Sequence, residues 1–88
     1  MIALKVTMPI ASTWPTREEL AARNAVEETL MASPIGKCTG AGGGMGEMHL
    51  TYSVESESFI ADAHAIIDEA MKRHIPNSPY EIRVHEEA

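Results

Sequence analysis

The sequence predicts a single α/β domain in which a four-stranded antiparallel sheet is covered on one face by two helices, in the chain order β-α-β-β-α-β. Three segments alternate apolar and polar residues with a period of two, which is typical of half-buried strands. Two longer segments repeat apolar residues at helical spacing. The chain has 88 residues, enough for one hydrophobic core, so we assign residues 1–88 to one domain.

The first strand is predicted over residues 2–8, where the even-numbered positions are apolar and Pro9 ends the alternation. The following loop, residues 10–15, carries the only tryptophan of the chain, Trp14. Two interpretations of this loop stay open. Its residues either fix the entry of the chain into the next helix, or Trp14 is exposed and acts as a contact anchor for a partner.

The first helix is predicted to begin after Thr16, because Thr16 and Glu19 fit a capping box in which each side chain accepts a hydrogen bond from the other residue's backbone N–H. Its apolar stripe is narrow, and charged residues cover the remaining surface. The helix is expected to end near Met31, since Ser33 precedes Pro34 and a residue before proline avoids the α region.

The second and third strands are predicted to form a hairpin. A short strand is expected over residues 35–39, and the clearest strand of the chain spans residues 48–54. Five of the six glycines lie between them, in residues 40–46, which we interpret as the joint of the hairpin. Alternation places Cys38 on the buried side of the sheet and His49 on the open side.

The second helix is predicted to be capped by Ser56 or Ser58, and a wide apolar stripe follows over residues 59–71. The final strand is predicted over residues 80–85, where apolar and charged residues alternate again. The tail, residues 86–88, is expected to fray.

Two strand–helix–strand halves with right-handed crossovers give a sheet of order 4-1-3-2. This element order resembles the ferredoxin-like fold over nearly the whole chain. The resemblance implies a polar open sheet face that such domains use for dimers or ligands, although the fold by itself specifies no function. The residues expected on this face are Lys5, Thr7, His49, Thr51, Ser53, Glu81 and Arg83.

Composition restricts the classes of partner. The net charge is −6 and the seven Lys and Arg residues are scattered, so nucleic-acid binding is not expected, whereas a basic protein partner would be attracted. The single cysteine forms no internal disulfide and suits a reducing compartment, so a cytoplasmic location is expected. No apolar stretch is long enough to span a membrane.

The glycine segment allows three interpretations. Backbone N–H groups of a Gly-rich loop can bind a phosphate, but phosphate loops lie between a strand and a helix, and this segment lies between two strands. The glycines otherwise form a flexible or bulged hairpin, or they allow a partner's backbone to approach Gly42, Gly43 and Gly44 closely.

No catalytic, metal-binding or cofactor-binding cluster is predicted, so we do not expect an enzyme. His64 and His74 lie about 80° apart on the second helix and nearly three turns from each other, too far to share one ion. Cys38 and His49 are the one pair considered for nucleophilic catalysis, and they are expected to face opposite sides of the sheet.

The run from Gly40 to Leu50, followed by an acidic strand end, is similar to segments of small bacterial proteins proposed as immunity proteins against toxins. That resemblance implies a small non-catalytic protein that inhibits a toxin by direct contact. The residues expected to contact a partner are Trp14, Gly42, Gly43, Gly44, Met45 and His49. The alternative is a small-molecule-binding regulatory domain that forms a homodimer through the open sheet face.

Overall fold

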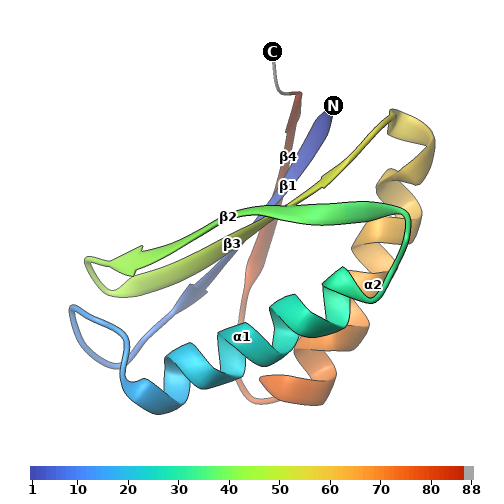
Figure 1. Ribbon diagram of the computed structural model, residues 1–88. Coiled ribbons are helices and arrows are strands. Elements are labelled where there is room, and N and C mark those ends of the chain that lie inside the picture. The colour runs from blue at the N-terminus through green and yellow to red at the C-terminus, as the bar shows by residue number, and fades with distance from the viewer. Residues whose placement is uncertain (87–88) are drawn as a thin grey trace.

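The computed structural model describes residues 1–86 and has the predicted order of strands and helices (Figure 1). A 3₁₀ turn, η1, is added before the second helix. The elements are β1 (Ile2–Pro9), α1 (Arg17–Met31), β2 (Gly36–Gly44), β3 (Glu47–Val54), η1 (Glu57–Phe59), α2 (Ile60–His74) and β4 (Glu81–Glu86).

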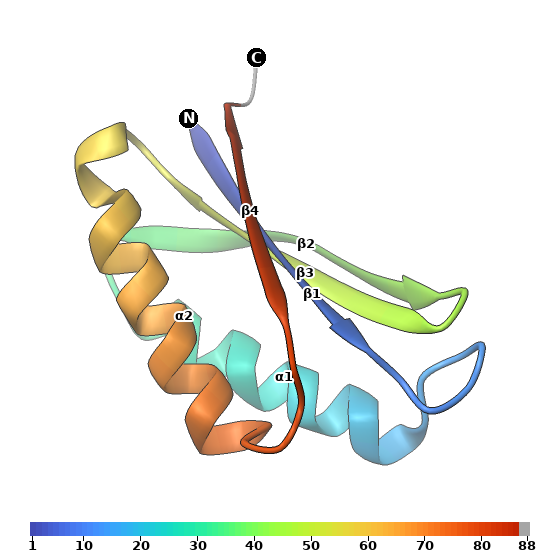
Figure 2. The ribbon, with the colours of Figure 1, turned by 180° about the vertical axis from the view of Figure 1, so that it is seen from behind.

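The four strands form one antiparallel sheet of order β2-β3-β1-β4, which is the predicted order read from the other edge. Figure 2 shows both helices on the same side of this sheet. The two central strands, β1 and β3, pair along their full length, from Ile2 opposite Val54 to Pro9 opposite Glu47. The ferredoxin-like α+β fold predicted from the sequence is therefore confirmed.

The core lies between the sheet and the two helices. The even-numbered positions of β1 and β3 point toward the helices and are buried, as the period of two predicts. Helix α2 adds four buried side chains and α1 only two, which matches the wide and narrow stripes of their sequences. The largest fully buried side chains include Tyr52, Leu4, Met8, Leu30, Leu50, Ile67 and Met71.

The two helix starts differ. The capping box of α1 is present, with Glu19 N–H donating to Oγ1 of Thr16 at 3.1 Å and Thr16 N–H donating to Oε1 of Glu19 at 2.8 Å. The predicted side-chain cap of the second helix is wrong. The hydroxyls of Ser56 and Ser58 bond each other at 2.8 Å, neither caps a helix, and the chain enters α2 through the 3₁₀ turn.

The glycine segment is part of a strand, which corrects the prediction of a joint over residues 40–46. Strand β2 runs through Gly44, with an irregularity between Cys38 and Gly40 where the register with β3 shifts. Only Met45 and Gly46 form the turn. Their φ angles of 56° and 85° are the pair of positive values that a two-residue type I′ hairpin turn requires.

The end of the chain also differs from prediction. Glu86 is the last residue of β4 and pairs with Ile2, so it does not fray. The rest of the predicted tail, residues 87–88, lies outside the described residues.

Candidate interaction site

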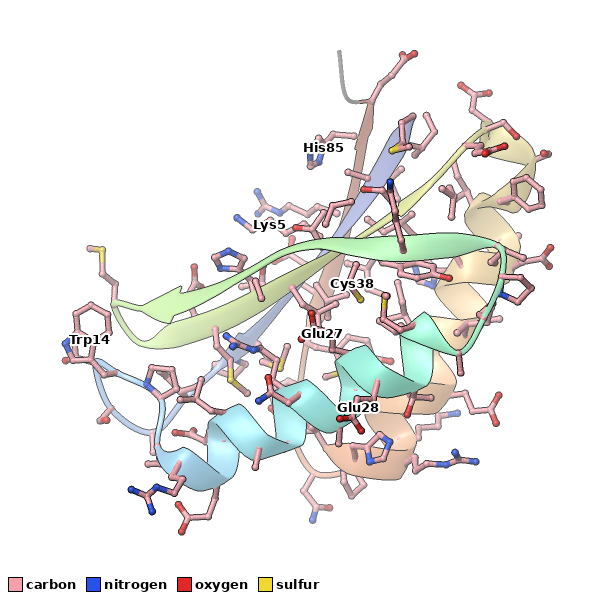
Figure 3. All side chains as sticks on the ribbon, viewed as in Figure 1. Lys5, Trp14, Glu27, Glu28, Cys38 and His85 are labelled. Atoms are coloured by element: carbon pink, nitrogen blue, oxygen red, sulfur yellow. The ribbon has the colours of Figure 1, made fainter. Side chains whose placement is uncertain are left out.

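Most of the predicted contact residues meet at one end of the molecule, where the loop after β1 packs on the β2–β3 hairpin. Ile10 N–H donates to the carbonyl of Gly46 at 3.0 Å, and Gly46 N–H donates to the carbonyl of Thr13 at 3.2 Å. Figure 3 shows Trp14 at this end, beside the hairpin turn. Segments about 30 residues apart in the sequence therefore form one surface.

The glycines at this end provide the space that the loop occupies. A Cβ atom on Gly43 would lie 2.8 Å from Cγ of Pro15, and one on Gly44 would lie 2.9 Å from Cζ3 of Trp14. Gly44 also has a φ of 139°, which other residues rarely adopt. The rings of Trp14 and Pro15 thus lie directly against the glycine backbone.

Two large apolar side chains remain exposed here, and we call Trp14 and Met45 the apolar tip. Trp14 is 68% exposed and Met45 is 92% exposed. Met45 also has left-handed backbone geometry, which costs a residue with a Cβ atom about 1–2 kcal/mol relative to right-handed geometry. Asn or Gly would be more stable at this position of the turn.

The other two predicted contact residues, Gly42 and His49, lie apart from the apolar tip. They pair across β2 and β3, and a Cβ atom on Gly42 would lie 2.8 Å from Cε1 of His49. Partial burial of the imidazole, with additional repulsion from Lys5 and Arg23, lowers the pKa of His49 below its ordinary value. His49 occupies an odd-numbered position of β3, opposite in direction to the buried even-numbered positions, so it belongs to the open sheet face.

The open sheet face is polar, as predicted. Lys5 on β1 lies directly opposite Arg83 on β4, and Nε of Arg83 is 2.7 Å from the carboxylate of Glu81. Ser53, which was predicted to be exposed on this face, is instead buried, and its hydroxyl lies 2.9 Å from that of Thr39. In Figure 3, Lys5 and His85 project to the side of the sheet opposite the helices.

Cys38 and His49 do not meet. Cys38 pairs with the buried Tyr52 and faces the helices, whereas His49 faces the open side. Burial of the thiol, with repulsion from Glu27, raises the pKa of Cys38 to about 11, so it holds little of the reactive thiolate at neutral pH. Within residues 1–86 no group of three or more His, Cys, Asp or Glu side chains is close enough together to hold a metal ion.

Helix α2 carries polar contacts that the sequence did not predict. The hydroxyl of Tyr80 donates to Asp68 at 2.5 Å, and Nδ1 of His64 lies 3.4 Å from the same carboxylate. The hydroxyl of Thr29 on α1 lies 2.8 Å from Nε2 of His74. These contacts link the two helices to each other and α2 to Tyr80, the residue before β4, so we interpret them as structural.

A groove between α1 and β2 was also not predicted. It has a volume of about 700 Å³ and is open to solvent. The residues that line it are Asn24, Glu27, Glu28, Met31, Ala32 and Cys38. No sequence signal marks this groove, because α1 and the edge of β2 become neighbours only when the chain folds.

Comparison with known proteins adds evidence on the fold. A solved structure described as "De novo designed protein Foldit4" is similar to this chain with a TM-score of 0.68 and 13% sequence identity, covering 99% of this chain and 98% of that one. No protein-family model matches, and the search of curated proteins finds no match. Among the described residues, no helix is long and apolar enough to cross a membrane.

Proposed function

We propose that this chain is a non-catalytic protein-binding domain that contacts its partner through the apolar tip. The observation that carries this proposal is Met45, which is almost fully exposed in a backbone conformation unfavourable to it. Neither its side chain nor its conformation improves folding, because a polar Asn or Gly suits the turn better. Exposed Trp14 beside it supplies the kind of aromatic anchor that dominates many protein interfaces.

The charge of the molecule suggests the chemistry of the partner. The net charge is −6, and the two helices together carry seven Asp and Glu residues but only four Lys and Arg residues. A protein with an apolar pocket inside a positively charged surface would be attracted by this field and would bury the apolar tip. A basic toxin is one such partner, which would make the chain an immunity protein, but the comparisons do not support that narrower proposal.

Affinity capture from the source organism at low salt tests the proposal. The bait is the wild-type chain, and the matched control is the double variant Trp14→Ala/Met45→Asn, whose folding is verified by circular dichroism. We expect a protein that the wild type retains and the double variant loses, and the same difference of at least about tenfold in affinity between purified components. Equal binding of wild type and double variant would contradict the role of the apolar tip.

The alternative proposal is a small-molecule-binding regulatory domain that dimerises through the open sheet face. The direct opposition of Lys5 and Arg83 favours it, since an anionic ligand would bind between two neighbouring cationic side chains, in competition with the Glu81 carboxylate that pairs with Arg83. A metabolite screen by thermal shift is the appropriate test. The alternative predicts a higher melting temperature with an anionic compound and a loss of that effect in Lys5→Gln.

A further inference from the structure

The two edges of the sheet differ in how well they resist pairing with another strand. Edge strand β4 places Glu81, Arg83, His85 and Glu86 within six residues, and such charges discourage further strand pairing. Edge strand β2 has one charged residue, Lys37, and none from Gly40 to Gly44, and no strand lies on its outer side. The β2 edge is therefore the one suited to accept an additional strand.

Helix α1 covers this edge only lightly. The backbone N–H of Cys38 donates to Sδ of Met31 at 3.4 Å, and a thioether sulfur is a weak acceptor. Further along β2, Nη1 of Arg23 donates to the carbonyl of Gly42 at 2.9 Å. A backbone carbonyl from another chain is a stronger acceptor than the thioether, so it would readily replace Met31 at Cys38.

The charge of the groove specifies the side chains of such a strand. Glu27 and Glu28 line it, and neither forms an ion pair within the described part of the chain. In Figure 3, Glu27 extends from α1 toward β2 near Cys38, and Glu28 lies one residue further along the helix. Two carboxylates without an ion pair, beside a sheet edge that α1 covers only lightly, favour a basic segment.

We propose that the groove between α1 and β2 binds an extended basic segment of a partner protein, which adds to the β2 edge as a fifth strand and places Lys or Arg side chains against Glu27 and Glu28. Strand addition of this kind obtains affinity from backbone hydrogen bonds and specificity from alternate side chains. A second copy of this chain is a poorer occupant, because two-fold pairing along β2 would bring Glu27 and Glu28 of both copies together. This inference rests on the proposed function, which it extends by a second contact.

The test uses a ten-residue peptide that alternates Lys and Thr, with both ends blocked, at low salt. Isothermal titration calorimetry measures binding, and ¹⁵N NMR locates it. We expect shifts at the amides of Cys38 and its neighbours on β2. The same peptide with Glu in place of Lys, and a version with N-methyl groups on alternate backbone nitrogens, should each bind at least about tenfold more weakly.

Two double variants distinguish the effect of the carboxylates in the groove from the effect of the net charge of the protein. Glu27→Gln/Glu28→Gln should weaken binding of the Lys/Thr peptide about tenfold, whereas the matched control Glu18→Gln/Glu69→Gln, which changes the net charge equally, should weaken it less than about twofold. Equal loss in both variants, full affinity of the N-methylated peptide, shifts confined to the open sheet face, or self-association through β2 would each overturn the proposal. The apolar tip variant should bind this peptide normally, so failure of the groove is distinguishable from failure of the proposed function.

Discussion

Replacement of Met45 by Asn should stabilise the protein although it removes a large apolar side chain. Met45 has a φ of 56°, in the left-handed region, where a residue with a Cβ atom loses about 1–2 kcal/mol and Asn loses much less. The side chain is 92% exposed, so its loss removes almost no packing. We therefore expect the free energy of unfolding to rise by about 1 kcal/mol, which corresponds to about 4–8 °C in a domain of this size.

Urea and thermal unfolding, followed by far-UV circular dichroism, measure this difference. The matched control is Met45→Leu, which keeps a large apolar side chain in the same unfavourable conformation and should leave stability within about 0.5 kcal/mol of the wild type. If Met45→Asn is no more stable than the wild type, or if Met45→Leu gains as much, the conformational explanation is refuted. A stabilised Met45→Asn that also loses its partner would show that this position serves binding at the expense of folding.

Three further changes test other parts of the structure. Gly43→Ala should destabilise the fold by about 1–3 kcal/mol because its Cβ has no space, whereas Gly40→Ala should stabilise it by about 0.5–1 kcal/mol; urea unfolding measures both. Tyr52→Phe should leave stability unchanged or higher, because the buried hydroxyl has no partner among the described residues; a loss above about 1 kcal/mol would contradict this. Tyr80→Phe should cost about 0.5–1.5 kcal/mol at pH 7. The hydrogen bond from Tyr80 lowers the pKa of Asp68, so the wild type loses this stabilisation as the pH falls below about 3.8, and Tyr80→Phe should show a smaller loss in acid unfolding curves.

Much of the architecture was predictable because it depends on local periodicity. Alternation in residues 2–8 and 48–54 identified the two central strands and their buried face, and the capping box located the start of α1 at Thr16. The start of α2 was mispredicted because serine is a good capping residue at both position 56 and position 58. In the folded chain the hydroxyls of Ser56 and Ser58 bond each other, so neither caps the helix.

The glycine segment shows where sequence patterns stop being informative. Glycines weaken a strand when considered alone, so residues 40–46 suggested a joint. In the folded chain β3 supplies a pairing partner for each of these glycines up to Gly44, and Pro15 and Trp14 occupy the space that side chains on Gly43 and Gly44 would fill. These neighbours come from distant parts of the chain, so the sequence around the glycines does not reveal them.

The candidate contact surfaces were also only partly predictable from the sequence. Trp14 and Met45 were identified as contact residues from the sequence, but their proximity and the strained geometry of Met45 became evident only in three dimensions. The α1–β2 groove had no sequence signal at all, because its carboxylates lie on a helix and its hydrogen-bonding groups on a strand edge.

The sequence by itself determined the number, type and order of the elements, the face that each one buries, and the overall negative charge. It did so because side-chain periodicity and charge are properties of neighbouring residues. Only the tertiary structure decided which glycines lie against a packed loop, where apolar side chains remain exposed and which sheet edge is suited to accept another strand. Those features depend on contacts between segments tens of residues apart, whose geometry is set by the packing of the whole domain.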